Sequence, residues 1–134
     1  MIELHGWLSI SETYEDEDNY EKAVLDSVMQ EVKKIVADND SVEIEYKNGV
    51  PFISTLICSN HRTPEIDLII NTYKLISETA TGSYGIIYIR DDEDSVHYNE
   101  FQIYIFKKGE CHYKVDNNLS PCIPEVENGD CNAR

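Results

Sequence analysis

Residues 82–94 constrain the fold more than any other stretch of this chain. Two glycines open the segment, and its apolar part, residues 83–90, has the aromatic and β-branched composition of a buried strand. One Arg and four consecutive acids then follow, from Arg90 to Asp94. A strand that ends in this way holds negative charge at a fixed place on a surface, and that arrangement suits the binding of a basic partner.

Hydrophobic periodicity predicts the remaining elements. Apolar residues alternate with period two in several strands, and Asn48-Gly49 is a strong signal for a hairpin turn. Further strands are expected over residues 2–10, 42–47, 50–58, 101–106 and 111–115, and helices over residues 19–37 and 64–79. The order βαββαβββ predicts an α+β fold, with a mostly antiparallel sheet and two helices packed on one face.

Capping residues indicate where each helix begins. Asp18 is expected to cap the first helix, and Thr63 to cap the second helix, which has Pro64 at its first position. His61-Arg62 is interpreted as the turn that enters the second helix. The apolar stripe expected on the first helix consists of Tyr20, Val24, Val28, Val32 and Ile35, widened by Leu25, Met29 and Val36.

The charge balance limits the class of partner. The chain has 134 residues, enough for one domain, expected over residues 1–127 with a disordered tail over 128–134. Its formal net charge is -15, which argues against binding to nucleic acid or to an anionic membrane, because both are polyanions. It favours a basic protein or a cation, although acidity that serves only solubility is an equal alternative. Without a signal segment or an apolar span, a cytoplasmic location is expected.

Signals for catalysis or metal binding are weak. There is no phosphate-binding glycine loop, and the four His residues have no metal-binding spacing. Residues 91–94 lack the spaced ligands and the glycine of a calcium loop. We therefore expect a non-enzymatic protein without metal or cofactor, with calcium binding or a carboxylate-dependent hydrolase as weaker alternatives. The cysteines are expected to be free thiols, with Cys58 and Cys111 packed as small apolar groups, although their even number leaves a disulfide open.

Two acid runs with nearby aromatic residues form the candidate partner surface. Residues 15–18 also suit the start of a helix, whereas the sequence reveals no cap that residues 91–94 would form. We expect the acids to steer a basic protein and the aromatics to anchor it, with Arg90 pairing inside the acidic loop. The expected contacts are Trp7, Asp16, Glu17, Asp18, Tyr88, Arg90, Asp91, Asp92, Glu93, Asp94 and Tyr98.

Six segments spread over nearly the whole chain carry a family resemblance. They are MIELHGWL at residues 1–8, ETYEDED at 12–18, NHR at 60–62, GSYGIIYIRDDED at 82–94, NEFQIY at 99–104 and LSPCIP at 119–124. With these segments the chain resembles the bacterial immunity proteins of polymorphic toxin and contact-dependent inhibition systems. It is similar in particular to immunity protein family seven.

The resemblance implies a small cytoplasmic α+β protein that binds and neutralises one cognate toxin domain, as a monomer or a 1:1 heterodimer, without a cofactor. Such toxins are often nucleases, and RNases of the EndoU-like type are among them. A nuclease is basic where it holds nucleic acid, so the acid runs would occupy its substrate groove. The alternative is a general acidic protein-binding module that has no toxin partner.

Overall fold

The structure is a computed structural model, and it describes residues 1–12, 22–37 and 39–127. Within these ranges the chain forms an α+β domain, and the predicted order βαββαβββ is confirmed. The elements are β1 (Ile2–Ser9), α1 (Lys22–Val36), β2 (Val42–Lys47), β3 (Val50–Ser59), α2 (Pro64–Thr79), β4 (Tyr84–Asp91), β5 (Phe101–Lys107) and β6 (Glu110–Val115).

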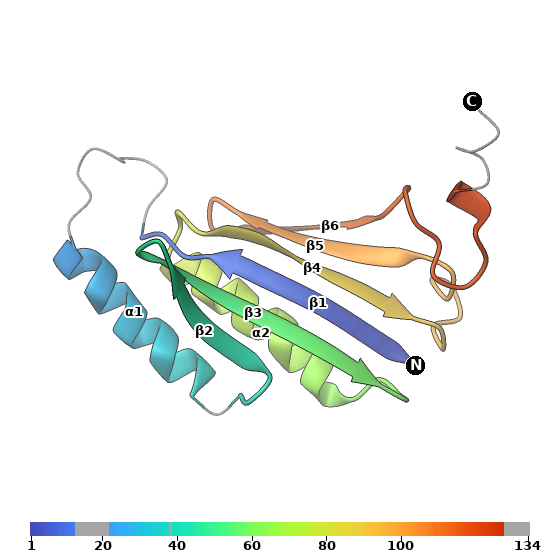
Figure 1. Cartoon of the computed structure of the whole chain (residues 1–134), viewed down its shortest axis with the longest axis horizontal. Helices are drawn as coiled ribbons and strands as arrows, with labels where there is room; N and C mark the ends of the chain where they lie inside the picture. Colours follow the sequence, from blue (N-terminus) through green and yellow to red (C-terminus); the bar gives the residue numbers. More distant parts are fainter. Residues whose placement is uncertain (13–21, 38, 128–134) are drawn as a thin grey trace.

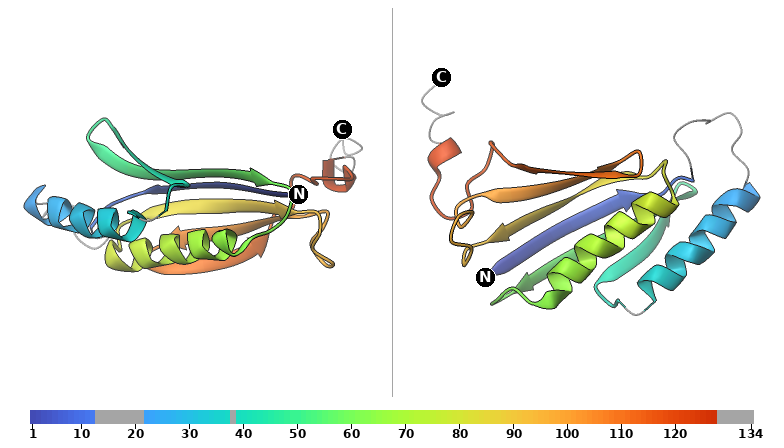
Figure 2. Two further views of the ribbon diagram at one scale, coloured as in Figure 1. Left: turned by 90° about the horizontal axis from the view of Figure 1, so that it is seen from below. Right: turned by 180° about the vertical axis from the view of Figure 1, so that it is seen from behind.

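The six strands form one sheet in the order β2-β3-β1-β4-β5-β6, and every neighbouring pair is antiparallel. Both helices lie on the same side of this sheet (Figures 1 and 2). The first strand of the chain therefore lies at the centre of the sheet, between β3 and β4. Within the described ranges, α1 and α2 form one layer and the sheet forms the other, and neither helix covers the opposite face of the sheet.

Two tight turns fix the registers at the ends of the sheet. Asn48 and Gly49 both have positive φ, 52° and 78°, as the predicted β2–β3 hairpin requires. Lys108 and Gly109 repeat this geometry, with φ of 53° and 74°, between β5 and β6. Pro51 lies at the start of β3, where strands tolerate proline.

The core lies between the sheet and the two helices, and it consists mainly of Ile, Leu and Val. Tyr73 of α2 is fully buried within it, and its hydroxyl lies 2.9 Å from the hydroxyl of Thr55 on β3. Gly6 of β1 leaves room for this ring, because a Cβ there would lie 2.8 Å from the Tyr73 hydroxyl oxygen. Gly6 thus marks a close packing contact between β1 and α2.

The structure corrects several details. The buried stripe of α1 is Leu25, Met29, Val32 and Val36, while Val28 and Ile35 are only partly buried. Val32 is buried as expected, while Leu25, Met29 and Val36, expected at the stripe's margin, also face the core; the side chains of Tyr20 and Val24 lie outside the described residues. Thr63 occupies the N-cap position of α2 but makes no capping hydrogen bond with its side chain. Cys58 is exposed rather than packed in the core, because it belongs to the alternate set of β3 residues that points away from the helices.

Candidate partner-binding surface

The acidic loop, residues 91–94, begins at the end of β4, and its first carboxylate faces inward. Asp91 falls in the same register as Ile87 and Ile89, on the helix side of the sheet, and only 5% of it is exposed. Its Oδ1 accepts a hydrogen bond from the backbone N–H of Glu93 at 3.1 Å. Its Oδ2 lies 3.9 Å from a guanidinium nitrogen of Arg62. Asp91, expected as a partner contact, is therefore held inside the protein's own structure.

Asp94 caps a turn that the sequence did not reveal. Its Oδ1 accepts hydrogen bonds of 2.8 Å from the backbone N–H groups of both Val96 and His97. These two bonds favour the ionised carboxylate and lower the pKa of Asp94. The acidic loop is thus closed by its own last carboxylate.

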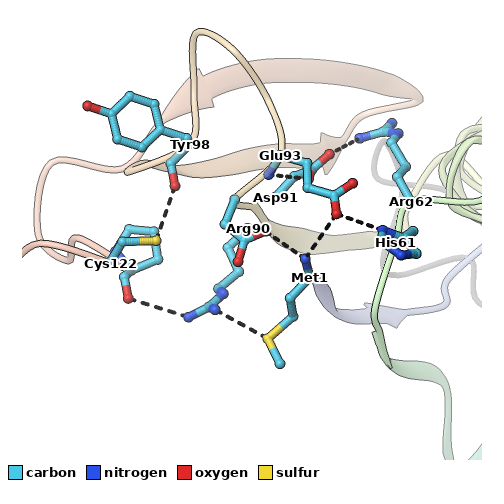
Figure 3. A network of polar contacts seen from close by, with 10 residues as sticks. Met1, His61, Arg62, Arg90, Asp91, Glu93, Tyr98 and Cys122 are labelled. Atoms are coloured by element: carbon cyan, nitrogen blue, oxygen red, sulfur yellow. Dashed lines mark hydrogen bonds and ion pairs between the residues drawn. The ribbon is translucent and has the colours of Figure 1, made fainter.

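The two middle acids of the loop are more exposed and pair with neighbouring segments (Figure 3). The Met1 amino group donates a hydrogen bond of 2.6 Å to Asp92, and this contact lowers the pKa of that carboxyl. Glu93 lies 2.6 Å from Nδ1 of His61, and Arg62 forms an ion pair of 2.8 Å with Asp67 of α2. The His61-Arg62 turn therefore joins the start of α2 to the acidic loop.

The hydrogen bonds of Arg90 go outside the acidic loop, in which pairing was expected, although its charge contributes to the lowered pKa of Asp92. One of its guanidinium nitrogens lies 3.4 Å from the carbonyl oxygen of Pro121, and the other lies 3.3 Å from Sδ of Met1 (Figure 3). Its side chain belongs to the opposite register from Asp91, on the sheet face that has no helix. Arg90 is therefore directed toward the segment after β6, across the end of the sheet.

Tyr88 also contacts that later segment. Its ring stacks on Phe101 with the centroids 4.5 Å apart, and its hydroxyl donates a hydrogen bond to Asp116. Burial and this donated bond both raise the pKa of Tyr88. Tyr98 is about half exposed, and its carbonyl oxygen accepts a contact of 3.4 Å from Sγ of Cys122 (Figure 3). Residues 116–127 thus fold back against one end of the sheet.

Trp7 lies apart from the acidic loop, on the sheet face opposite the helices. We call this face the open face, and six of its side chains form an apolar centre: Trp7, Leu56, Tyr84, Ile86, Ile103 and Ile105. Trp7 is directly opposite Ile86 in the register, and Ile86 is opposite Ile105 on the next strand. The rings of Trp7 and Tyr84 meet edge to face at 6.2 Å.

Reasoning from the sequence missed the partners of Trp7 on this face. The signal was present, since residues 101–106 are apolar in both registers. A strand that is apolar on both faces suggests a sheet covered on both sides. In the structure both helices pack on one side, so the second apolar register faces outward.

The described residues offer no metal site, since no group of three or more His, Cys, Asp or Glu side chains among them is placed to hold an ion. A hollow of about 490 Å³ lies beside the start of β2 and is lined partly by Asp40, Glu43 and Leu56. It adjoins the open face at Leu56. The expected contacts Asp16, Glu17 and Asp18, like the start of the first helix, lie outside the described residues.

Fold and surface together define a small α+β protein with a broad apolar sheet face and a structured acidic loop. A model of the family described as immunity protein 7 (Imm7) matches residues 1–128, so the chain belongs to that family and is an immunity protein against a toxin. No curated protein and no solved structure matches the chain. None of the described helices is long and apolar enough to cross a membrane.

Proposed function

We propose that the cognate toxin is a nuclease with a basic substrate groove, and that this protein neutralises it by covering that groove. The observation that carries the proposal is the net charge of -15 on an immunity protein of 134 residues. A nuclease concentrates Lys and Arg where it holds phosphates. An inhibitor with the opposite charge is attracted to that same surface and competes with the substrate for it.

Asp92 and Glu93 are the members of the acidic loop best placed to attract a basic surface, since their side chains are 36% and 50% exposed. Asp91 and Asp94 act through the loop that they hold in shape. Tyr98 presents an exposed ring beside the same loop. Asp16, Glu17 and Asp18 remain proposed contacts that contribute negative charge.

The test is coexpression of this chain with the toxin domain encoded immediately upstream of its gene. We expect a stable complex on copurification, rescue of growth, and loss of the toxin's nucleic acid cleavage in a purified assay. An RNase assay with and without divalent metal would distinguish metal-dependent from metal-independent cleavage. A complex that forms while cleavage continues would contradict groove masking, and a toxin domain without nuclease activity would contradict the proposed class of toxin.

A further inference from the structure

We propose that the open face is the docking surface for the toxin domain, with Trp7, Leu56, Tyr84, Ile86, Ile103 and Ile105 at the centre of the interface. This inference rests on the proposed function and places its binding surface on the sheet rather than on the acidic loop.

The first argument is the concentration of apolar side chains on one exposed surface. Leu56, Tyr84 and Trp7 are 70%, 57% and 42% exposed, and they come from three adjacent strands. Ile86 on β4 and Ile103 and Ile105 on β5 are half-buried and continue the apolar surface onto the next strand. Contiguous apolar surface of this kind on a soluble protein marks an interaction site, and Trp and Tyr are the residues that most often anchor one.

Neither α1 nor α2 covers the apolar centre in the part of the chain that the structure describes. Figure 2 shows both helices on the other side of the sheet. Residues 116–127 contact this side of the sheet at Tyr88 and Arg90, in the second half of β4. Trp7, Ile86 and Ile105 lie one same-face position beyond Tyr88 in the register, whereas Leu56 and Ile103 lie level with it.

The size of the face fits a specific complex. β1 and β4 are each eight residues long. Strands spaced about 4.8 Å apart with a rise of about 3.3 Å per residue make a six-stranded face roughly 25 Å on each side. Each partner in a specific complex buries about 800 Å². The open face therefore provides most of one such surface.

Charge identifies the occupant as a basic protein rather than a second copy of this chain. Two copies would each bring a net charge of -15 to the contact, and like charges oppose association. A basic domain is instead attracted by the negative charge of this chain. Charged residues of both signs border the apolar centre: Glu43, Glu45 and Lys47 at β2, and Lys107, Glu110 and Lys114 at β5 and β6. An apolar centre beside charged residues is the usual anatomy of an interface.

The acidic loop is less suited to be the centre of the interface, because its carboxylates already have partners. Asp91 and Asp94 accept backbone hydrogen bonds, and Glu93 is bonded to His61. A partner would have to replace these contacts to use the same oxygens. We therefore assign the loop to electrostatic steering and the open face to close contact.

The test compares two double variants that add the same charge. Leu56→Arg with Tyr84→Arg changes the open face, and Leu68→Arg with Leu75→Arg changes the exposed side of α2, where these leucines are 55% and 49% exposed. Both variants lose the same amount of long-range attraction. We expect the open-face variant to bind the toxin domain about 100-fold more weakly, mainly through faster dissociation, and the α2 variant to stay within about 3-fold of wild type.

Circular dichroism and thermal unfolding check that both variants are folded. If the open-face variant binds the toxin domain within about 3-fold of wild-type affinity, the assignment is overturned. It is also overturned if the α2 variant loses as much affinity as the open-face variant. Both outcomes would leave the proposed function standing. No binding by the wild-type chain would instead overturn the proposed function. If the free wild-type protein forms a homodimer and the open-face variant does not, the open face is occupied by a second copy of this chain, and the proposal is wrong.

Hydroxyl-radical footprinting of the wild-type complex gives an answer that does not depend on the folding of a variant. We expect oxidation of Trp7, Leu56 and Tyr84 to fall at least about 5-fold on toxin binding, while Leu68 and Leu75 keep their rates, because only the buried interface is desolvated. Unchanged oxidation of Trp7 and Tyr84 in the complex would overturn the proposal.

Discussion

At the scale of single residues, the centre of the fold depends on the space beside two glycines. The nearest neighbours of a Cβ at Gly6 would be the hydroxyl oxygen and Cζ of Tyr73, at 2.8 and 3.1 Å. At Gly85 they would be backbone atoms of β1, with the carbonyl oxygen of Trp7 at 2.1 Å. A side chain can move whereas the backbone of a paired central strand cannot. Replacement of Gly85 by a larger residue should therefore be tolerated less well than replacement of Gly6.

We predict that Gly6→Ala destabilises the protein by about 2 kcal/mol, because Tyr73 must shift from a tightly packed site. Burial raises the pKa of Tyr73 to about 12, so its hydroxyl is neutral and bonded to Thr55 at neutral pH. Tyr73→Phe alone should cost about 1 kcal/mol through the unpaired Thr55 hydroxyl. Urea unfolding of the double variant should show a loss smaller than the sum of the two, since the atom nearest to the new methyl group is gone. Strictly additive losses would contradict this contact.

At the scale of elements, the acidic loop depends on pH through Asp94. Its folded pKa lies below the unfolded value of about 3.9. The ionised carboxylate therefore contributes stability that is complete above the unfolded pKa and is lost as pH falls through the folded pKa.

We predict that the difference in unfolding free energy between wild type and Asp94→Asn stays constant above about pH 5 and closes as pH falls below about 4, where both side chains are neutral acceptors. Urea unfolding from about pH 6 to about pH 2 measures this difference. Asp94→Ala is the matched variant, because it removes the acceptor as well as the charge, so its difference from wild type should persist in acid. A difference for Asp94→Asn that does not change with pH would show that its charge has no part in closing the turn.

The sequence predicted the elements of the fold better than it predicted the candidate surface. Period-two alternation and Asn48-Gly49 depend on local geometry, so the strand order along the chain and this hairpin could be inferred correctly. The inward register of Asp91 depends on how β4 pairs with β1, which the composition of the strand does not contain. The cap at Asp94 was hidden for a related reason, because a run of acids looks solvated until the backbone direction is known. The apolar centre of the open face was missed because the spatial order of the strands, which brings Trp7 beside Ile86 and Ile105, does not follow from local patterns.

At the scale of the whole molecule, we infer that the net charge and the apolar centre of the open face act at different steps of toxin binding. A net charge of -15 acts over the Debye length, about 10 Å at 0.1 M salt, and it raises the rate of encounter. The apolar centre of the open face acts only on contact, so it governs how long the complex lasts. Substitutions in the acidic loop should therefore change the association rate, and substitutions in the apolar centre should change the dissociation rate.

We predict that Asp92→Ser with Glu93→Ser slows association with the toxin domain by about 3-fold and makes it less sensitive to salt, while dissociation stays nearly unchanged. These two acids are the exposed members of the loop, and Asp91 and Asp94 are kept because they hold its shape. Stopped-flow or surface-based kinetics from about 50 mM to about 500 mM salt provide the measurement, with wild-type association expected to fall by about tenfold or more over this range. Lys33→Ser with Lys34→Ser on α1 is the control of opposite sign, and it should speed association slightly. Faster dissociation of the acid variant, with association unchanged, would place the acidic loop inside the close contact and contradict the division of roles between the loop and the open face.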